Sequence, residues 1–519
     1  MSESITIPAA FRAAAAVRAN QPLLLFPDRD VCYAEVDRDS DRCAAGLAMQ
    51  GVGRGDRVAL YCINSVEFVV AYLGILKAGA VVVPVNLLLN PKEIAYILED
   101  AGVVALMYHS AMDAQVVALD DLGALPPTRI ALGEGMVQGQ SLDFASLLAT
   151  AGPAPDLAVD PVVELAAILY TSGTTGRPKG AMLSHANLVA NTRSVLAALA
   201  LRPGEDRLLV VLPMFHSFAA TVGMLTPLLH GLALAPVPRF DPGLVSEVIA
   251  AVGATVFLGV PSMYNLILRL PDERTPAWQS VRMGVSGGAA MPVELMRRFE
   301  ARFGFPVLEG DGPTECSPVT CVNPPDGPRK PASVGLPVPD VEIEILDDVG
   351  NRLPVGEIGE LCVRGPNVMR GYWRLPEATA EAFFGDWLRT GDLGYKDADG
   401  YLFMVDRKKD MVIVNGMNVY PRMVEEVLYA HPDIVEAAVV GEPHPSHGEI
   451  VVAYVVIRPG SGLDAAGIKA YCRDNLGPHQ RPRKVLLREA LPKNATGKIL
   501  KRELRRQGEL ERGIDRPQP

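Results

Sequence analysis

Residues 169–188 read LYTSGTTGRPKGAMLSHANL, and this stretch decides how the rest of the chain is interpreted. Its centre is rich in Gly, Ser and Thr and carries two basic side chains, Arg177 and Lys179, between apolar flanks. Because glycine tolerates positive φ, the backbone N–H groups of such a loop can turn toward one centre and bind an anion. The order G-x-x-G-x-x-K-G, with Pro178 blocking a helix, excludes the common GxxxxGK(S/T) P-loop. The stretch therefore predicts a phosphate-binding loop of another kind; the alternative is a flexible surface loop.

Further motifs follow in a fixed order along the chain. RTGDLG stands at 389–394, DRKKD at 406–410 and PKNATGK at 492–498, while GDRV stands earlier, at 55–58. Together with TSGTTGRPKG and SHANL, this set resembles the AMP-forming adenylating enzymes, which include acyl-CoA synthetases, peptide-synthetase adenylation domains and beetle luciferases. The chain is most similar to a fatty-acid or related carboxylic acid–CoA ligase. The resemblance implies an ATP-dependent enzyme that forms an acyl-adenylate and then an acyl-CoA thioester.

The spacing of apolar runs predicts a large N-terminal domain of layered α/β structure over residues 1–406. Strand-like runs at 57–61 and 80–84 alternate with helix-like segments at 66–77 and 91–100. Such alternation is typical of α/β layering, in which helices cover a mostly parallel sheet.

The pattern of apolar and polar residues changes after Gly335. Short alternating segments separated by Gly, Pro and Asp predict an antiparallel, barrel-like subdomain at about 335–406. The charged run at 406–410 fits an exposed linker between two strands. Residues 407–519 then predict a small α+β domain of ordinary domain size. The resemblance places a hinge at Lys409, about which this mobile domain rotates.

Composition limits the class of protein. The chain has 519 residues, 49% of them hydrophobic, so it can bury a large core in more than one domain. Its formal net charge of −11 disfavours nonspecific nucleic-acid binding. No apolar run reaches the ~20 residues of a membrane span, and no secretory signal is recognisable at the start. Seven scattered cysteines without zinc spacing indicate free buried thiols, and we expect a cytoplasmic enzyme.

The resemblance assigns residues to the nucleotide site. Thr314 would bond a phosphate oxygen and Glu315 would help to hold Mg²⁺, which prefers oxygen ligands. Asp392 would accept both ribose hydroxyls, and Arg407 would bond the ribose from the other side. The remaining ATP- or AMP-binding residues that the resemblance implies belong to the phosphate loop, the turn beside adenine and the segment before Thr314: Thr171, Ser172, Gly173, Thr174, Thr175, Gly176, Lys179, Gly287, Gly288, Ala289, Asp311 and Gly312.

Asp311 departs from the family pattern. The family normally has a tyrosine at this position, and its ring stacks on adenine. An acidic side chain cannot stack, but it can accept a hydrogen bond from the ligand or from a neighbouring segment. Both interpretations stay open.

Lys498 would serve the first half-reaction. A carboxylate that attacks the α-phosphorus of ATP builds negative charge on the phosphoryl oxygens, and a fixed cation offsets that charge. The sequence predicts that Lys498 stands at the start of a helix; the alternative is one more lysine in a basic tail. After rotation about the hinge, Gly416, Met417 and Asn418 would line the channel for the CoA thiol.

The run LPMFHSF at 212–218 resembles the segment that lines the acyl pocket. His216 would gate the pocket or touch the substrate carboxylate; the alternative is a structural histidine. Relatives that activate amino acids carry an aspartate here, whereas this run holds no acid, so an uncharged, apolar acyl group is favoured. The expected apolar walls of the pocket are Phe215, Phe218, Val260 and Met263.

Several alternatives remain open at this stage. The acceptor is either free CoA or the phosphopantetheine of a carrier protein, and the acid is either fatty or aryl and alicyclic. A nucleotide sensor without turnover is disfavoured because Lys498 is present, and luciferase-like oxidation has no support in the sequence. The expected cofactors are ATP, Mg²⁺ and coenzyme A, and a homodimer is an open expectation.

Overall fold

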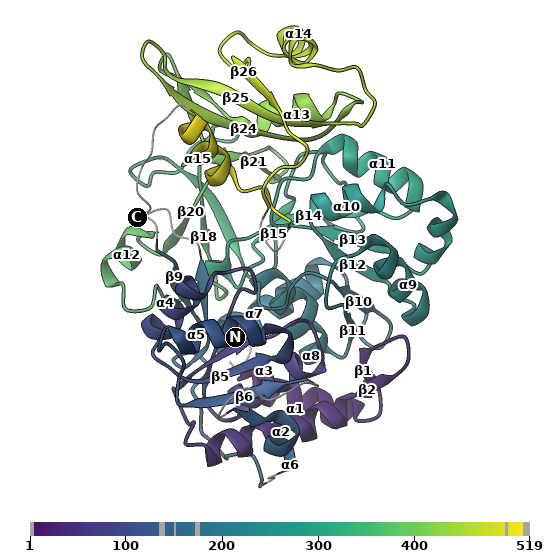
Figure 1. Cartoon of the computed structure of the whole chain (residues 1–519), viewed down its shortest axis with the longest axis vertical. Helices are drawn as coiled ribbons and strands as arrows, with labels where there is room; N and C mark the ends of the chain where they lie inside the picture. Colours follow the sequence, from purple (N-terminus) through teal and green to yellow (C-terminus); the bar gives the residue numbers. More distant parts are fainter. Residues whose placement is uncertain (1–4, 134–140, 150–151, 172–176, 494–496, 512–519) are drawn as a thin grey trace.

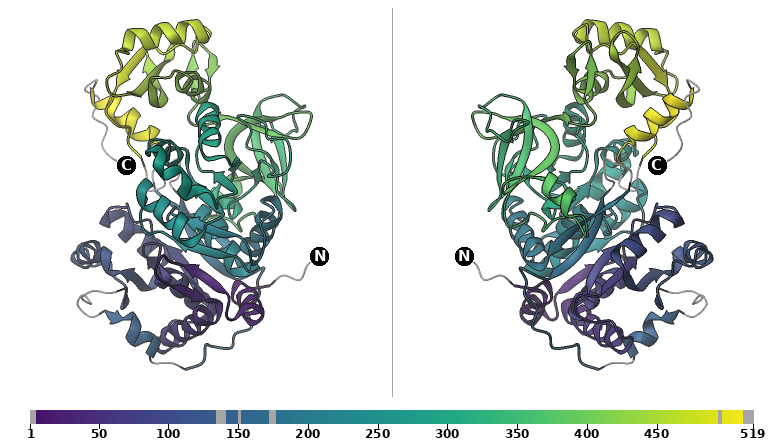
Figure 2. Two further views of the ribbon diagram at one scale, coloured as in Figure 1. Left: turned by 90° about the vertical axis from the view of Figure 1, so that its right-hand side faces the viewer. Right: turned by 90° about the vertical axis from the view of Figure 1, so that its left-hand side faces the viewer.

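The computed structural model describes residues 5–133, 141–149, 152–171, 177–493 and 497–511. The larger, N-terminal part of the chain forms the lower body of the molecule, and the smaller C-terminal part lies above it (Figure 1). Two side views show the same division, with the C-terminal part projecting from the body (Figure 2). Among the described residues, no helix is long and apolar enough to cross a membrane.

Two mostly parallel sheets form the core of the body. The described residues place seven strands in one sheet, in the order β7 (Leu142–Asp143), β6 (Thr128–Leu132), β5 (Val103–His109), β3 (Arg57–Tyr61), β4 (Val81–Pro84), β8 (Leu165–Thr171) and β9 (Lys179–Ser184). They place nine strands in the other, in the order β16 (Leu336–Pro337), β15 (Cys321–Val322), β14 (Val307–Asp311), β13 (Met283–Ser286), β12 (Val256–Gly259), β10 (Arg207–Val210), β11 (Ala233–Pro236), β1 (Pro22–Leu25) and β2 (Asp30–Cys32). Strands such as β4 and β12 are continuous apolar runs because they are buried on both faces.

Helices cover both sheets. Those of the body are α1 (Ile7–Arg18), α2 (Tyr33–Met49), α3 (Val66–Lys77), α4 (Pro91–Ala101), α5 (Asp113–Asp121), α6 (Phe144–Ala149), α7 (His185–Ala198), α8 (Thr226–His230), α9 (Pro242–Val252), α10 (Pro261–Ile267), α11 (Val293–Phe303) and α12 (Pro376–Glu381), with a π-helical segment η2 (Ala219–Leu225) and short 3₁₀ segments η1 (Ser110–Met112), η3 (Asp272–Trp278) and η4 (Thr314–Cys316). Their ends follow local sequence rules. Helix α4 has an Asn90–Glu93 capping box and Pro91 in its first turn, and it ends at Gly102 with φ +62°.

The phosphate loop joins two antiparallel strands. Strand β8 ends at Thr171, β9 begins at Lys179, and these two residues pair across the ladder. A P-loop instead joins a strand to a helix, so this topology agrees with its exclusion from the sequence. The centre of the loop, residues 172–176, lies outside the described residues.

An antiparallel sheet occupies the region after Gly335, where the sequence pattern changes. Its strands are β17 (Glu342–Leu346), β18 (Gly359–Arg364), β20 (Trp387–Lys396) and β19 (Phe383–Phe384), and β21 (Leu402–Arg407) pairs with β20. The antiparallel pairing predicted for this region is confirmed. The charged run was expected to be an exposed linker, which is wrong for its first half. Asp406 is buried and Arg407 still belongs to β21, so only residues 408–410 form a turn.

The C-terminal part has its own sheet and its own apolar core. Its strands are β23 (Met417–Val419), β22 (Val412–Val414), β25 (Gly448–Ile457) and β24 (Ile434–His444), with β26 (Lys484–Leu487) beside β25, and its helices are α13 (Pro421–Tyr429), α14 (Ala465–Asn475) and α15 (Lys501–Glu511). Asn415 and Gly416 form the two-residue turn between β22 and β23, both with positive φ. Asn-Gly is the pair that such a hairpin turn favours.

The predicted position of Lys498 at the start of a helix is wrong. Helix α15 begins three residues later, at Lys501. Before it, Lys493 and Ile499 form an antiparallel bridge, and the Leu500 N–H donates to the Pro492 carbonyl at 2.8 Å. Lys498 therefore lies next to this bridge and outside the helix.

All seven cysteines are free, as expected. Six are buried and Cys32 is half-buried.

Candidate active site

The candidate site lies where several elements of the body meet the C-terminal part. The parallel strands β13 and β14 end there, and the carboxyl ends of such strands are the usual ligand-binding edge of an open α/β sheet. Gly287 and Gly288 follow β13, while Asp311 ends β14 and leads into η4. Strands β20 and β21 bring Asp392 and Arg407 to the same place.

Asp392 and Arg407 face each other across the β20–β21 ladder. The Asp392 Oδ1 atom lies 3.0 Å from Arg407 Nε, and the two residues are register partners. The Asp392 side chain is 2% exposed, whereas the Arg407 side chain is 41% exposed. A buried carboxylate held by a guanidinium at the edge of a cleft can accept hydrogen bonds from a diol, as the ribose assignment requires.

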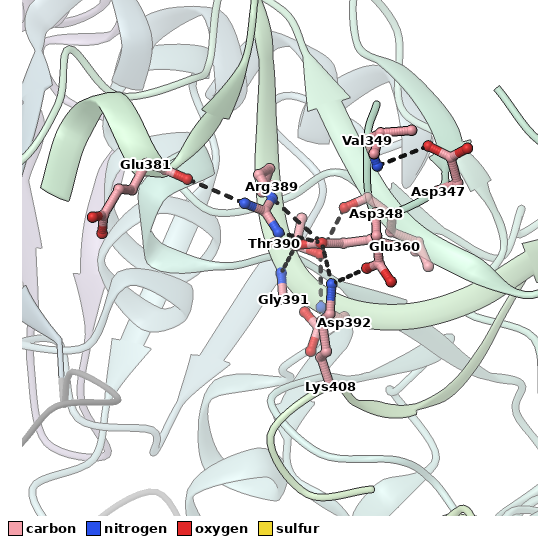
Figure 3. Close-up of polar contacts among 11 residues, drawn as sticks. Asp347, Asp348, Val349, Glu360, Glu381, Arg389, Thr390, Gly391, Asp392 and Lys408 are labelled. Carbon is pink, nitrogen blue, oxygen red and sulfur yellow. Dashed lines mark hydrogen bonds and ion pairs between the residues drawn. The ribbon is translucent and has the colours of Figure 1, made fainter. Parts of the chain in front are cut away.

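A buried carboxylate that the sequence interpretation missed positions the backbone of β20 just before Asp392. Glu360 Oε1 accepts a hydrogen bond from the Gly391 N–H at 3.1 Å, and its Oε2 lies 3.0 Å from Arg389 Nη2 and 3.4 Å from Lys408 Nζ. Figure 3 shows these contacts converging on Glu360. Glu360 sits in an alternating strand pattern that looks like any half-buried strand, so sequence alone gave no signal for its role.

Thr314 and Glu315 meet the end of the phosphate loop. Glu315 Oε1 accepts hydrogen bonds from the Tyr372 hydroxyl at 2.9 Å and from the Thr171 hydroxyl at 3.4 Å. The Lys179 ammonium lies 5.2 Å from the Tyr372 ring centroid, which keeps its charge close to this carboxylate. Thr314 Oγ1 lies 3.2 Å from Ser217 Oγ. The other phosphate-loop residues, Ser172, Gly173, Thr174, Thr175 and Gly176, lie outside the described residues.

A divalent cation fits this arrangement if the nucleotide supplies most of its ligands. Such a cation takes oxygen ligands, commonly one or two carboxylates together with phosphates. The described residues contain no group of three or more His, Cys, Asp or Glu that could form a protein cage. Glu315, next to Thr314 and within reach of Thr171, offers the single carboxylate that a nucleotide-bound cation needs.

Lys498 enters the site from the C-terminal part. The carbonyl of the preceding Gly497 accepts a hydrogen bond of 3.1 Å from the Ser262 hydroxyl on α10. Gly497 has φ +81°, and a Cβ there would lie 2.4 Å from Ser262 Oγ, so only glycine fits. Burial lowers the pKa of Lys498 to about 8, Arg407 lowers it as well, and the carboxylates of Asp392 and Asp311 oppose this shift.

Asp311 faces the same charges. Burial raises the pKa of Asp311 to about 6, and Asp392 adds to this effect, whereas Arg407 and Lys498 oppose it. Its backbone is fixed, because its carbonyl accepts hydrogen bonds from both the N–H and the hydroxyl of Thr320 at 3.0 Å. A Cβ on the following Gly312 would lie 1.8 Å from the Pro318 carbonyl oxygen. The Asp311 carboxylate is thus a second acid, beside Asp392, that interacts with Arg407 and Lys498.

An apolar cavity opens beside these groups. We call the side of the cavity next to the ends of β13 and β14 its mouth; this side is lined by His216, Gly287, Gly288, Asp311 and Gly312. Its remaining lining is mostly apolar and comes from α7, η2, β13 and the β14–β15 region: Val195, Ala198, Leu199, Ser217, Phe218, Val222, Val285, Ser286, Gly310, Pro318, Val319 and Val322. Burial lowers the pKa of His216 to about 4, with a further contribution from Lys498, so this imidazole is neutral at neutral pH.

One of the four predicted acyl-pocket residues lines the cavity, and the other three do not. Phe218 lines the cavity, and its ring lies 3.3 Å from the position of a Cβ on Gly287. Phe215 and Met263 are buried but do not line it. Val260 is buried next to the mouth, 3.8 Å from the Cβ position of Gly288. The walls on α7 went unnoticed in the sequence because an apolar helix face looks the same whether it packs on a core or lines a cavity.

The remaining predicted site residues do not line the cavity. Lys409 is exposed in the turn after β21. Gly416, Met417 and Asn418 are exposed on the β22–β23 hairpin and do not line the cavity. Ala289 is half-buried in the turn after β13, next to Gly288.

Comparisons with known proteins identify the family of the chain. The family model for the AMP-binding enzyme matches residues 11–373, and that for the AMP-binding enzyme C-terminal domain matches residues 423–498. The chain is 37% identical over 529 aligned residues to a long-chain-fatty-acid–CoA ligase of Salmonella typhimurium, with 95% of this chain and 93% of that protein covered.

Solved structures with similar folds cover nearly the whole chain. The anthranilate CoA ligase AuaEII in complex with anthranoyl-AMP has a TM-score of 0.90 at 29% identity, covering 99% of both chains. ATP-bound MatB from Rhodopseudomonas palustris has a TM-score of 0.88 at 34% identity, covering 97% of this chain and 99% of that one. The family matches extend over both parts of the molecule, and the predicted family is confirmed: this chain belongs to the AMP-binding enzymes.

Proposed function

We propose that this chain is an ATP-dependent acid–CoA ligase that forms an acyl-adenylate and then an acyl-CoA thioester. The observation that carries the proposal is the position of Lys498. The bond between Ser262 and Gly497 holds it against the body, where its charge interacts with Asp392 and Arg407 and with two residues that line the apolar cavity, Asp311 and His216. An apolar acid bound in the cavity would present its carboxylate to a nucleotide held at that mouth.

In the first half-reaction, the carboxylate oxygen attacks the α-phosphorus of ATP and pyrophosphate leaves. Asp392 would hold the ribose while Arg407 and Lys498 face the phosphoryl oxygens, where negative charge builds. Lys179 and the phosphate loop would hold the departing phosphates. Neutral His216 would orient the carboxylate at the cavity mouth. Mg²⁺, held by Glu315 and the phosphates, would supply further positive charge there.

The second half-reaction needs a different arrangement. The CoA thiol must reach the acyl carbon, whereas in this structure the segment that carries Lys498 is bonded to the body through Gly497 and Ser262. We infer that residues 407–519 rotate as a unit about Lys409, relative to residues 1–406 with their antiparallel subdomain at about 335–406. Rotation would withdraw Lys498 and bring Gly416, Met417 and Asn418 to the site as the thiol channel. The exposed position of Lys409 in a turn supports this hinge.

The lining of the cavity supports an apolar acid. Apart from Asp311 and His216 at the mouth, no Asp, Glu, Lys, Arg or His stands among the described lining residues. Valine, alanine and leucine walls favour a hydrocarbon chain or ring over a charged or amino acid. Among the similar proteins, one acts on long-chain fatty acids and another holds an aromatic acyl-adenylate, so both fatty and aryl acids belong in the test.

A panel of carboxylic acids tests the proposal. Each acid is incubated with ATP and Mg²⁺, with and without CoA, and AMP, pyrophosphate and thioester are measured. The proposal expects pyrophosphate without CoA, and AMP and thioester only when CoA is added. Pyrophosphate with every acid but thioester only on a carrier-protein phosphopantetheine would favour the alternative acceptor. No pyrophosphate with any acid would refute the ligase assignment.

Location and assembly are proposals as well. Seven free cysteines support a reducing compartment such as the cytoplasm. A homodimer remains to be tested by light scattering of the purified protein.

A further inference from the structure

A buried ion pair joins the C-terminal part to the body beside the site. Arg422 Nη2, at the start of α13, lies 3.4 Å from Glu309 Oε1 on β14. The side chains are 12% and 2% exposed, respectively. Glu309 Oε1 also accepts a hydrogen bond from the Met291 N–H at 2.9 Å, while Oε2 has no hydrogen-bond partner among the described residues. Glu309 therefore depends on Arg422 for its principal counter-charge.

Arg422 is itself fixed from several directions. Its N–H donates to Asp406 Oδ2 at 2.9 Å, and its Nη1 donates to the Met404 carbonyl at 2.9 Å. Both acceptors lie on β21, before the turn that holds Lys409, whereas Arg422 lies after it. The guanidinium thus spans the proposed hinge and reaches β14, two residues before Asp311.

Acidic side chains outnumber the cation around this ion pair, since Glu426 and Asp311 both lie near Glu309. Burial raises the pKa of Glu309 to about 7, Arg422 opposes the rise, and Glu426 and Asp311 add to it. Burial also raises the pKa of Glu426, on the same helix as Arg422, while Arg422 opposes this and the Val293 N–H of α11 bonds the carboxylate. One guanidinium therefore serves buried Glu309 and half-buried Glu426, and it is the single cation among the described residues that lowers the pKa of either carboxyl.

We propose that Arg422 and Glu309 form a latch that holds the C-terminal domain where it delivers Lys498, which makes Arg422 a positioning residue for adenylation. The inference rests on the proposed function, because it requires two half-reactions in two domain positions. Arg422 lies on the moving side of Lys409 and Glu309 on the fixed side, so rotation must separate them. Separation breaks this ion pair, so the pair favours the docked position for as long as the carboxylate is ionised.

The latch gives adenylation a distinctive pH dependence. Without Arg422, the pKa of Glu309 rises further, because only the hydrogen bond from the Met291 N–H then opposes the effect of burial. Below that pKa Glu309 is neutral, so docking the domain without Arg422 costs little. Above it the carboxylate is ionised, and docking then buries an unpaired charge. A variant that lacks Arg422 should therefore lose more adenylation, relative to wild type, as pH rises.

Single-turnover rates of both half-reactions test the latch. Arg422→Met should slow pyrophosphate release about tenfold at pH 8.5 and leave thioester formation from pre-made acyl-AMP within about twofold of wild type. The deficit should shrink at pH 6. Adding Glu309→Gln to Arg422→Met should restore most of the adenylation rate, since the unpaired charge is gone. Arg422→Lys, which keeps the charge, should fall between wild type and Arg422→Met.

Matched controls separate the latch from general damage. Arg458→Met removes an exposed arginine of the same domain, whose Nη2 bonds the Pro432 carbonyl, and should leave both rates unchanged. Equal slowing of both half-reactions by Arg422→Met, or a deficit that does not change with pH, would overturn the latch while the ligase function stands. If wild type released no pyrophosphate with any acid, the proposed function would fall, and the positioning role of Arg422 with it.

Discussion

The Ser262 hydroxyl donates a hydrogen bond of 3.1 Å to the carbonyl oxygen of Gly497, the residue before Lys498. A second contact between the same parts lies nearby, where Asn265 Nδ2 on α10 donates to the Val435 carbonyl at 3.1 Å. Helix α10 of the body thus holds two segments of the C-terminal part. We infer that these contacts hold the arrangement in which Lys498 would serve adenylation.

Asp311→Tyr tests the departure from the family pattern. If the site lacks only a flat ring, this substitution should lower the KM for ATP about tenfold with little change in kcat, because base stacking is worth roughly 1–3 kcal/mol. If Asp311 is instead needed as a charge beside Lys498, activity should fall.

Asp311→Asn distinguishes the ways in which activity could fall. A modest loss would indicate hydrogen bonding, and a large one would indicate that the charge matters. If neither substitution altered the KM for ATP, Asp311 would not contact the nucleotide.

Lys409→Pro should impair thioester formation and spare adenylation. Proline fixes φ near −65° and removes an N–H donor, so a residue that must change its backbone angles could no longer do so. Pyrophosphate release and acyl transfer to CoA are measured separately by rapid quench. Lys408→Pro is not a suitable control, because the Lys408 N–H donates to the Gly391 carbonyl at 2.9 Å. A Lys409→Pro enzyme competent in both steps would place the hinge elsewhere.

The pH profile of adenylation should fall on its alkaline side. The pKa of Lys498 is lowered to about 8, so the side chain is cationic below that pH and progressively neutral above it. Only the cation offsets phosphoryl charge, and kcat/KM reports groups of the free enzyme. We expect kcat/KM for the acid to decline above about pH 8, and Lys498→Arg to move that decline to higher pH. An unchanged alkaline limb in Lys498→Arg would assign the decline to another group.

Ala198→Trp should obstruct the acyl cavity. Ala198 is half-buried at the end of α7 and lines the cavity, so an indole there would occupy the space of the acyl group. We expect the KM for long or bulky acids to rise at least about tenfold, since filling a packed site costs roughly 1–3 kcal/mol. The KM for ATP should not change. Equal use of every acid by this variant would show that the acyl group binds elsewhere.

Local sequence rules predicted much of the fold. The helix expected at 66–77 is α3 with the same ends, because Ser65 caps it and accepts from the Phe68 N–H. The strand expected at 57–61 is likewise β3, because a short apolar run bounded by turn residues is typical of a buried strand. The misplaced helix start at Lys498 has a tertiary cause, because Ile499 forms a backbone bridge with Lys493 and Gly497 bonds Ser262, so the helix begins only after these contacts.

The sequence predicted those residues of the candidate site that belong to recognisable motifs, and it missed the others. Asp392, Arg407, Glu315 and Lys498 stand in signatures, and the structure brings Asp392, Arg407 and Lys498 together at one end of β14. Glu360 and Arg422 have no signature, because their importance arises from partners that are distant in sequence. Glu309 lies 113 residues from Arg422, and no local pattern reports such a pairing.

The most direct test of the two-step account is the Lys498→Ala enzyme, assayed for each half-reaction in single turnover. Removal of a positioned cation should slow pyrophosphate release from ATP and acid at least about a hundredfold, by analogy with the loss of one transition-state donor. Thioester formation from pre-made acyl-AMP and CoA should stay within about twofold of wild type, because Lys498 faces the site in one domain arrangement only. Equal loss of both half-reactions would contradict the account.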